Sequence, residues 1–114
     1  MYASGEWSGE AIDIWNGDMD HLRYFSVKTP GSLSQGVFCD DEGIYFVRSA
    51  QNGYPAEIRI YNWKAKLQAT VELKLKEGFE PESISVVDGY VYIAGTDWTV
   101  RRGSVYRLYF DLVE

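Results

Sequence analysis

A short β-rich segment occurs twice in this chain. The stretch DEGIYFV at 41–47 returns as VDGYVYI at 87–93, with 89 − 43 = 46 residues between the two glycines. A second stretch, EIRIY at 57–61, returns as VYRLY at 105–109 after a step of 107 − 59 = 48 residues. Repeats of about 40 to 50 residues made of short strands are typical of propeller blades, each of which is a four-stranded sheet. The sequence therefore predicts an all-β fold of antiparallel blade repeats, without significant helix.

The repeat frame predicts nine strands, which amount to about two and a quarter blades. The segment 66–75 also carries leucine and valine at helical spacing, but its alternation and its place in the repeat favour a strand. The predicted organisation is a partial blade at 1–30, a complete blade at 31–78 and a partial blade at 79–114, together one propeller segment. The predicted strands are 11–15, 21–27, 36–40, 44–48, 57–63, 66–75, 83–87, 90–94 and 104–110.

About two and a quarter blades are too few to close a propeller ring. Two open blades would also leave wide apolar faces in contact with water. We therefore expect further blades from a homo-oligomer, from another chain, or from a longer parent protein.

Three stretches of the sequence resemble TolB-like six-bladed propellers, including secreted and phage-associated ones. They are QGVFCDDEGIY at 35–45, EIRIYNW at 57–63 and EPESISV at 80–86. The resemblance covers roughly residues 31–110. In this group the same blades serve as sugar-binding modules, lactonases, periplasmic scaffolds and virion parts, so the resemblance implies a fold more than an activity.

Charge and composition limit the classes of partner that this chain is expected to bind. The formal net charge is −6 and the basic residues are few, which argues against a nucleic-acid binder, because such surfaces need clustered Lys and Arg. No apolar stretch approaches the roughly 20 residues that span a bilayer, and we expect a soluble chain. The single cysteine, Cys39, is expected to be a small buried residue and leaves the compartment undetermined. The resemblance adds an extracellular or virion-associated location as an expectation.

Aromatic residues recur in the predicted loops between the second and third strands of each blade. These loops lie on the face of a propeller where ligands usually bind. Aromatic rings stack on sugar rings, although they also serve to wedge neighbouring blades together. Two arginines follow in the last of these loops, where they are either solvated or available to a carboxylate or phosphate. The candidate ligand residues are Trp7, Tyr54, Trp98, Arg101 and Arg102.

Gln35 and Glu82 occupy equivalent positions at the start of the innermost strand, when one residue is inserted in the 39–42 stretch. Both would lie near the propeller axis, and Gln35 joins the candidate ligand residues. In lactonase-like relatives an acidic residue at this kind of position holds a divalent metal, so the resemblance makes Glu82 the metal-ligand candidate. The alternative is that Glu82 hydrogen-bonds turn amides near Pro81, because one carboxylate is not a metal site.

The remaining polar clusters predict no catalytic residue. Asp18-Met19-Asp20 is expected in a hairpin turn, because the glycine and terminal glutamate of a calcium loop are missing. His21 is the only histidine and is expected on a strand surface. The sequence thus favours a non-catalytic binding or assembly module that needs no cofactor, with glycan binding or a role in a virion or surface complex. A metal-dependent lactonase-like hydrolase fragment and a purely structural subunit are the alternatives.

Overall fold

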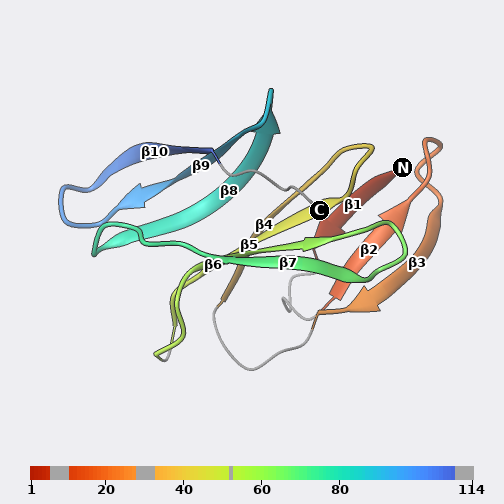
Figure 1. Cartoon of the computed structure of the whole chain (residues 1–114), viewed down its shortest axis with the longest axis horizontal. Coiled ribbons are helices and arrows are strands. Elements are labelled where there is room, and N and C mark those ends of the chain that lie inside the picture. Colours follow the sequence, from red (N-terminus) through yellow and green to blue (C-terminus); the bar gives the residue numbers. More distant parts are fainter. Residues whose placement is uncertain (6–10, 28–32, 52, 110–114) are drawn as a thin grey trace.

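A computed structural model describes residues 1–5, 11–27, 33–51 and 53–109 of the chain. These residues form ten strands in three antiparallel sheets and no helix, so the predicted all-β fold is confirmed (Figure 1). No helix in the described residues is long and apolar enough to span a membrane. The strands are β1 (Tyr2–Gly5), β2 (Ala11–Trp15), β3 (His21–Ser26), β4 (Leu33–Cys39), β5 (Ile44–Ser49), β6 (Glu57–Tyr61), β7 (Leu67–Glu72), β8 (Phe79–Val87), β9 (Tyr90–Asp97) and β10 (Arg102–Tyr109).

Each sheet is a blade-like meander of neighbouring strands. The order is β1-β2-β3 in the N-terminal sheet, β4-β5-β6-β7 in the middle sheet and β10-β9-β8 in the C-terminal sheet. The prediction of nine strands is wrong by one, because β1 pairs with β2 and adds a third strand to the N-terminal sheet. The predicted strand at 66–75 is confirmed as β7, an edge strand of the middle sheet.

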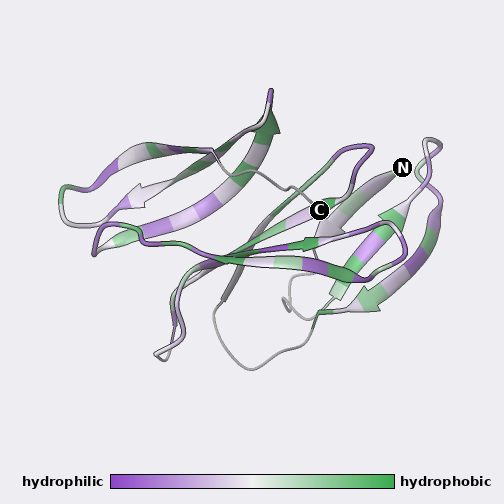
Figure 2. Ribbon diagram, viewed as in Figure 1, coloured by the Kyte–Doolittle hydropathy of each residue, from purple (hydrophilic) through white to green (hydrophobic). Residues whose placement is uncertain are grey.

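The middle sheet lies between the other two and is covered on both faces (Figure 1). All six residues of β5 are buried, and the first four alternate between two apolar clusters. Tyr45 and Val47 pack toward the C-terminal sheet, whereas Ile44 and Phe46 pack toward the N-terminal sheet. Figure 2 shows hydrophilic residues gathered at the β4–β5 and β6–β7 turns, away from these clusters. The core is therefore two interfaces that share one sheet.

The sheets stack in one repeating direction. We call the face of a sheet that points toward the next sheet in the sequence its front, and the opposite face its back. Ile44 on the back of the middle sheet packs against the N-terminal sheet, and Val91 on the back of the C-terminal sheet packs against the middle sheet. These equivalent positions are 91 − 44 = 47 residues apart. Front meets back at both interfaces, as in consecutive propeller blades.

The two glycines that mark the repeat in the sequence are therefore not structurally equivalent. The β4–β5 hairpin closes with a bond from the Asp40 N–H to the Gly43 oxygen (3.0 Å). The β8–β9 hairpin closes at the pair Val87 and Tyr90, so Gly43 corresponds to Tyr90 and not to Gly89. Because side chains alternate along a strand, this shift of one residue exchanges the front and back faces.

The turns after β2 and β6 repeat at a step of 46 residues. The Asn16 Oδ1 accepts the backbone N–H of Asp18 and Asp20, and the Asn62 Oδ1 accepts the equivalent N–H groups. Met19 and Ala65 both have left-handed backbones, with φ of 64° and 66°. The predicted hairpin turn at Asp18-Met19-Asp20 is thus confirmed.

Candidate functional site

A pocket of about 340 Å³ lies where the middle and C-terminal sheets meet. Three segments form it: the end of β5 with the loop that follows, the start of β8, and the turn after β9. These are the connections that the repeat frame places on the ligand face of a propeller. The lining residues are Ser49, Ala50, Gln51, Gly78, Phe79, Glu80 and Trp98.

Glu80 is the polar centre of this pocket. Its Oε1 accepts a hydrogen bond from the Gln35 amide (3.1 Å), and its Oε2 accepts one from the Trp98 indole N–H (3.1 Å). The Gln35 amide nitrogen also lies 3.1 Å from the Ser49 hydroxyl. The network joins both sheets and holds the Trp98 ring at a fixed angle, while the side chain stays 59% exposed. An indole face, a carboxylate and an amide are thereby presented together to solvent.

Gln35 and Glu82 share a structural position, as the sequence alignment indicated. Each is the extra residue of a β-bulge, in β4 between Ser34 and Gly36 and in β8 between Pro81 and Ser83. A bulge re-aims its residue out of the regular alternation. Gln35 turns to Glu80, whereas Glu82 is exposed.

Burial, the neighbouring Glu80 charge and a hydrogen bond with the Glu80 carboxyl raise the pKa of Glu82 above its ordinary value. Two carboxyl groups therefore lie close together beside the bulge. No group of three or more His, Cys, Asp or Glu suited to a metal is found in the described part of the chain. The metal role of Glu82, and the lactonase-like activity that depends on it, stay predictions from the resemblance.

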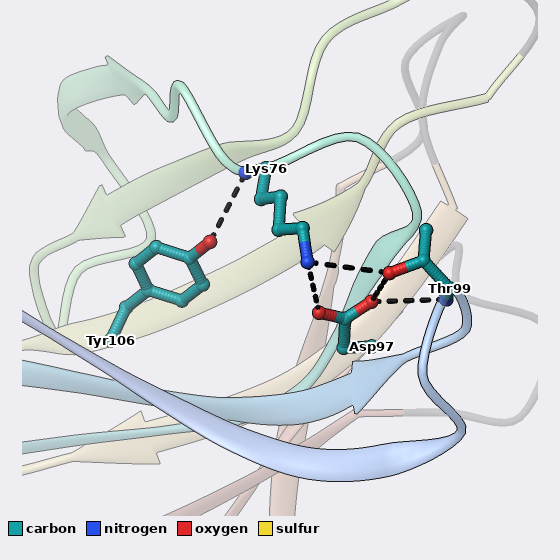
Figure 3. Close-up of polar contacts among 4 residues, drawn as sticks. All are labelled: Lys76, Asp97, Thr99 and Tyr106. Carbon is teal, nitrogen blue, oxygen red and sulfur yellow. Dashed lines mark hydrogen bonds and ion pairs between the residues drawn. The ribbon is translucent and has the colours of Figure 1, made fainter.

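A polar clasp holds the turn that carries Trp98 (Figure 3). The Lys76 ammonium lies 2.8 Å from Asp97 Oδ2 and 3.3 Å from the Thr99 hydroxyl. The Thr99 hydroxyl and backbone N–H both donate to Asp97 Oδ1, at 2.5 and 3.0 Å. The Tyr106 hydroxyl accepts the Lys76 backbone N–H (3.2 Å). The bonds from Lys76 and Thr99 lower the pKa of Asp97 to about 2.

Gly78 fixes the same turn through the backbone. Its carbonyl accepts the Trp98 N–H (2.9 Å), and its φ of 85° is left-handed, where glycine is favoured. A Cβ at this position would lie 2.6 Å from the Thr99 methyl carbon. The segment from Lys76 to Gly78 therefore positions the Trp98 turn at two points.

The other predicted ligand residues lie outside this pocket or outside the described residues. Tyr54 lines a second, more open depression of about 640 Å³, which shares Ala50 and Gln51 with the first. Arg101 and Arg102 are exposed in the same turn as Trp98 but line neither pocket. Trp7 lies outside the described residues. The structure thus brings Gln35 and Trp98 together and places Tyr54 beside them.

Sequence reasoning missed Glu80, which the structure makes the partner of both Gln35 and Trp98. Its sequence signal is its place in the Glu80-Pro81-Glu82 triplet at the entry of β8, where a proline and a bulge break the alternation. Asp97 was missed as well, although an Asp side chain in a turn often accepts the backbone N–H two residues further on, as Asp97 does from Thr99.

Cys39 and His21, which the sequence analysis also considered, do not line the pocket. Cys39 is partly buried in β4 against the cluster shared with the N-terminal sheet. His21 is exposed at the start of β3, with its Nε2 2.7 Å from Asp13 Oδ1.

Comparisons with protein-family models, with curated proteins and with solved structures find no match to this chain. The candidate site therefore rests on its own geometry.

Proposed function

We propose that this chain is a non-catalytic, propeller-type binding module whose pocket takes a saccharide. The observation that carries the proposal is the Trp98 indole, 59% exposed at the pocket and tied to Glu80 by its N–H. The hydrogen bond from its N–H to Glu80 anchors this exposed ring at one end. A ring held in one orientation stacks on a sugar with little loss of conformational entropy.

Each polar group of the pocket has a place in this proposal. The Glu80 carboxyl has about four acceptor positions, of which Gln35 and Trp98 take two and the hydrogen bond with Glu82 takes at most one, so a position remains for a sugar hydroxyl donor. The Gln35 carbonyl supplies a further acceptor on the side of the middle sheet. The volume of about 340 Å³ is at the lower end of ligand sites and fits one or two sugar rings. The acidic pocket favours neutral sugars over sulfated or sialylated ones, because like charges repel.

The test is a screen of neutral and acidic oligosaccharides on an array, followed by calorimetric titration of the best binder. We expect Trp98→Ala to weaken binding by at least about tenfold, since aromatic anchors dominate small interfaces. Glu80→Gln keeps the shape of the side chain and is expected to weaken binding less.

Leu67→Ala is the control, because Leu67 is a large apolar residue of similar exposure (51%) on β7 of the middle sheet, outside the pocket. Loss of binding in Trp98→Ala alone supports the proposal. Undiminished binding in Trp98→Ala, or an array without any binder, contradicts it.

A further inference from the structure

In the described part of the chain, each of the two terminal sheets has an outer face that no other sheet covers. The outer face of the C-terminal sheet is its front, and it carries Val87, Tyr90, Tyr92, Val105, Arg107 and Tyr109. Among these, Val105 and Tyr109 are 64% and 67% exposed. The outer face of the N-terminal sheet is its back, and it carries Tyr2, Ser4, Asp13, Trp15, His21 and Tyr24. Tyr, Trp and Arg are the residues enriched at protein interfaces.

Both outer faces are internally ordered. The Trp15 indole N–H donates to the Ser4 hydroxyl (2.9 Å), and Asp13 is bonded to His21. On the other face, the Tyr90 and Tyr109 rings are in contact and the Arg107 guanidinium lies over the Tyr90 ring, 5.1 Å from its centroid. Ordered side chains lose little entropy when a partner covers them.

The internal stacking of the chain indicates what fits these faces. At both internal interfaces the front of one sheet packs against the back of the next. The exposed front of the C-terminal sheet therefore fits the back of another sheet, and the N-terminal sheet has an exposed back. Within the chain, Ile60 on the front of the middle sheet and Tyr106 on the back of the C-terminal sheet belong to one interface cluster. By the repeat steps, Arg107 takes the place of Ile60 and Asp13 takes the place of Tyr106. Opposite charges therefore occupy two positions whose counterparts inside the chain belong to one inter-sheet cluster.

We propose that the front of the C-terminal sheet binds the back of the N-terminal sheet of a second copy of this chain, with Arg107 opposite Asp13. Each copy offers one front and one back, so two copies pair at both ends. Together they contribute six sheets, twice the three of one chain. Six lies within the four to eight blades of closed propellers. None of the residues named on the two outer faces lines the saccharide pocket.

The test is sedimentation velocity of the 114-residue chain at pH 8. We expect the wild type to sediment as a two-chain species. Arg107→Glu places two carboxylates opposite each other and is expected to weaken the association at least about tenfold. Asp13→Arg is expected to do the same, and the double variant Asp13→Arg, Arg107→Glu to restore the association.

Lys64→Glu is the control, because it changes the net charge by the same amount on an exposed turn of the middle sheet. It is expected to leave the association unchanged. A monomeric wild type overturns the proposal and assigns the outer faces to another partner. Association that survives Arg107→Glu, or that the double variant does not restore, overturns the pairing of Arg107 with Asp13.

Discussion

The middle and C-terminal sheets are alike in topology and differ in what covers them. Strands β5 and β6 of the middle sheet and β9 of the C-terminal sheet have hydrogen-bonded neighbours on each side, and β5 and β9 are the equivalent strands of the two sheets. Every residue of β5 is buried, while β9 is buried at alternate positions along its first half. The sequences follow this difference, since Ile-Tyr-Phe-Val in β5 is apolar on both faces and Tyr-Val-Tyr-Ile in β9 puts tyrosine on its outer face. Tyrosine suits a face that is wet in one state and covered in another.

The largest expected effect compares truncation of one aromatic residue in each sheet. Phe46 in β5 is 1% exposed, so Phe46→Ala removes a ring from a closed cluster and is expected to lower the free energy of unfolding by about 3 to 5 kcal/mol. Tyr90 in β9 is 39% exposed on the outer face, and Tyr90→Ala is expected to cost about 1 kcal/mol or less. Urea denaturation of dilute protein measures both. Equal losses would show that the outer face is as closed as the middle sheet.

A smaller effect is expected from a methyl group added inside the C-terminal sheet. A Cβ on Gly95 would lie 2.0 Å from the Glu80 carbonyl oxygen, so Gly95→Ala must push β8 away from β9, at a cost of about 1 to 3 kcal/mol. Gly17→Ala is the control, because a Cβ there would meet nothing within 4 Å. Chemical denaturation measures the loss. An unchanged midpoint for Gly95→Ala would contradict the close pairing of β8 and β9 at this point.

The smallest effect concerns the clasp of Lys76, Asp97 and Thr99 that holds the Trp98 turn. The pKa of Asp97 in the folded chain is about 2, below the ordinary value of 3.8. A lowered pKa means that the ionised clasp stabilises the fold above about pH 4, and that this contribution is lost as the pH falls to about 2. Asp97→Asn is therefore expected to be less stable than wild type at pH 7, with the difference shrinking toward pH 2.

Urea midpoints across this pH range measure the difference, with Asp18→Asn in an exposed turn as the control. A gap between Asp97→Asn and wild type that is constant with pH would show that Asp97 contributes to the fold without its charge.

The sequence predicted the fold class, most strands and the equivalence of Gln35 and Glu82, because each depends on local alternation and turn chemistry. It missed β1, since Tyr-Ala-Ser-Gly has no alternation and becomes a strand only by pairing with β2. It also aligned Gly43 with Gly89, because both precede a strand. Backbone hydrogen bonds decide which residue closes each hairpin, and the sequence does not show them. The closing residue in turn decides which face of the sheet each following side chain lies on.

Only part of the candidate site was predicted, because local sequence patterns show some of its residues and not others. Trp98 was found because an aromatic residue in a propeller loop is conspicuous. Glu80 was not, since its role arises from two residues that are 45 positions before it and 18 after it. Contacts of this length come from the stacking of sheets and have no local signature.

Among the residues that the structure describes, the middle sheet is closed on both faces, whereas each terminal sheet packs against a neighbouring sheet on one face only. Hydrogen exchange of dilute protein, followed by mass spectrometry, tests this difference most directly by comparing Ile44–Ser49 with Tyr90–Asp97, two strands with the same hydrogen-bonded neighbourhood. We predict that the amides of β5 exchange markedly more slowly than those of β9, because only β5 is covered on both faces. Exchange of β9 that is as slow as that of β5, or slower, would contradict the account.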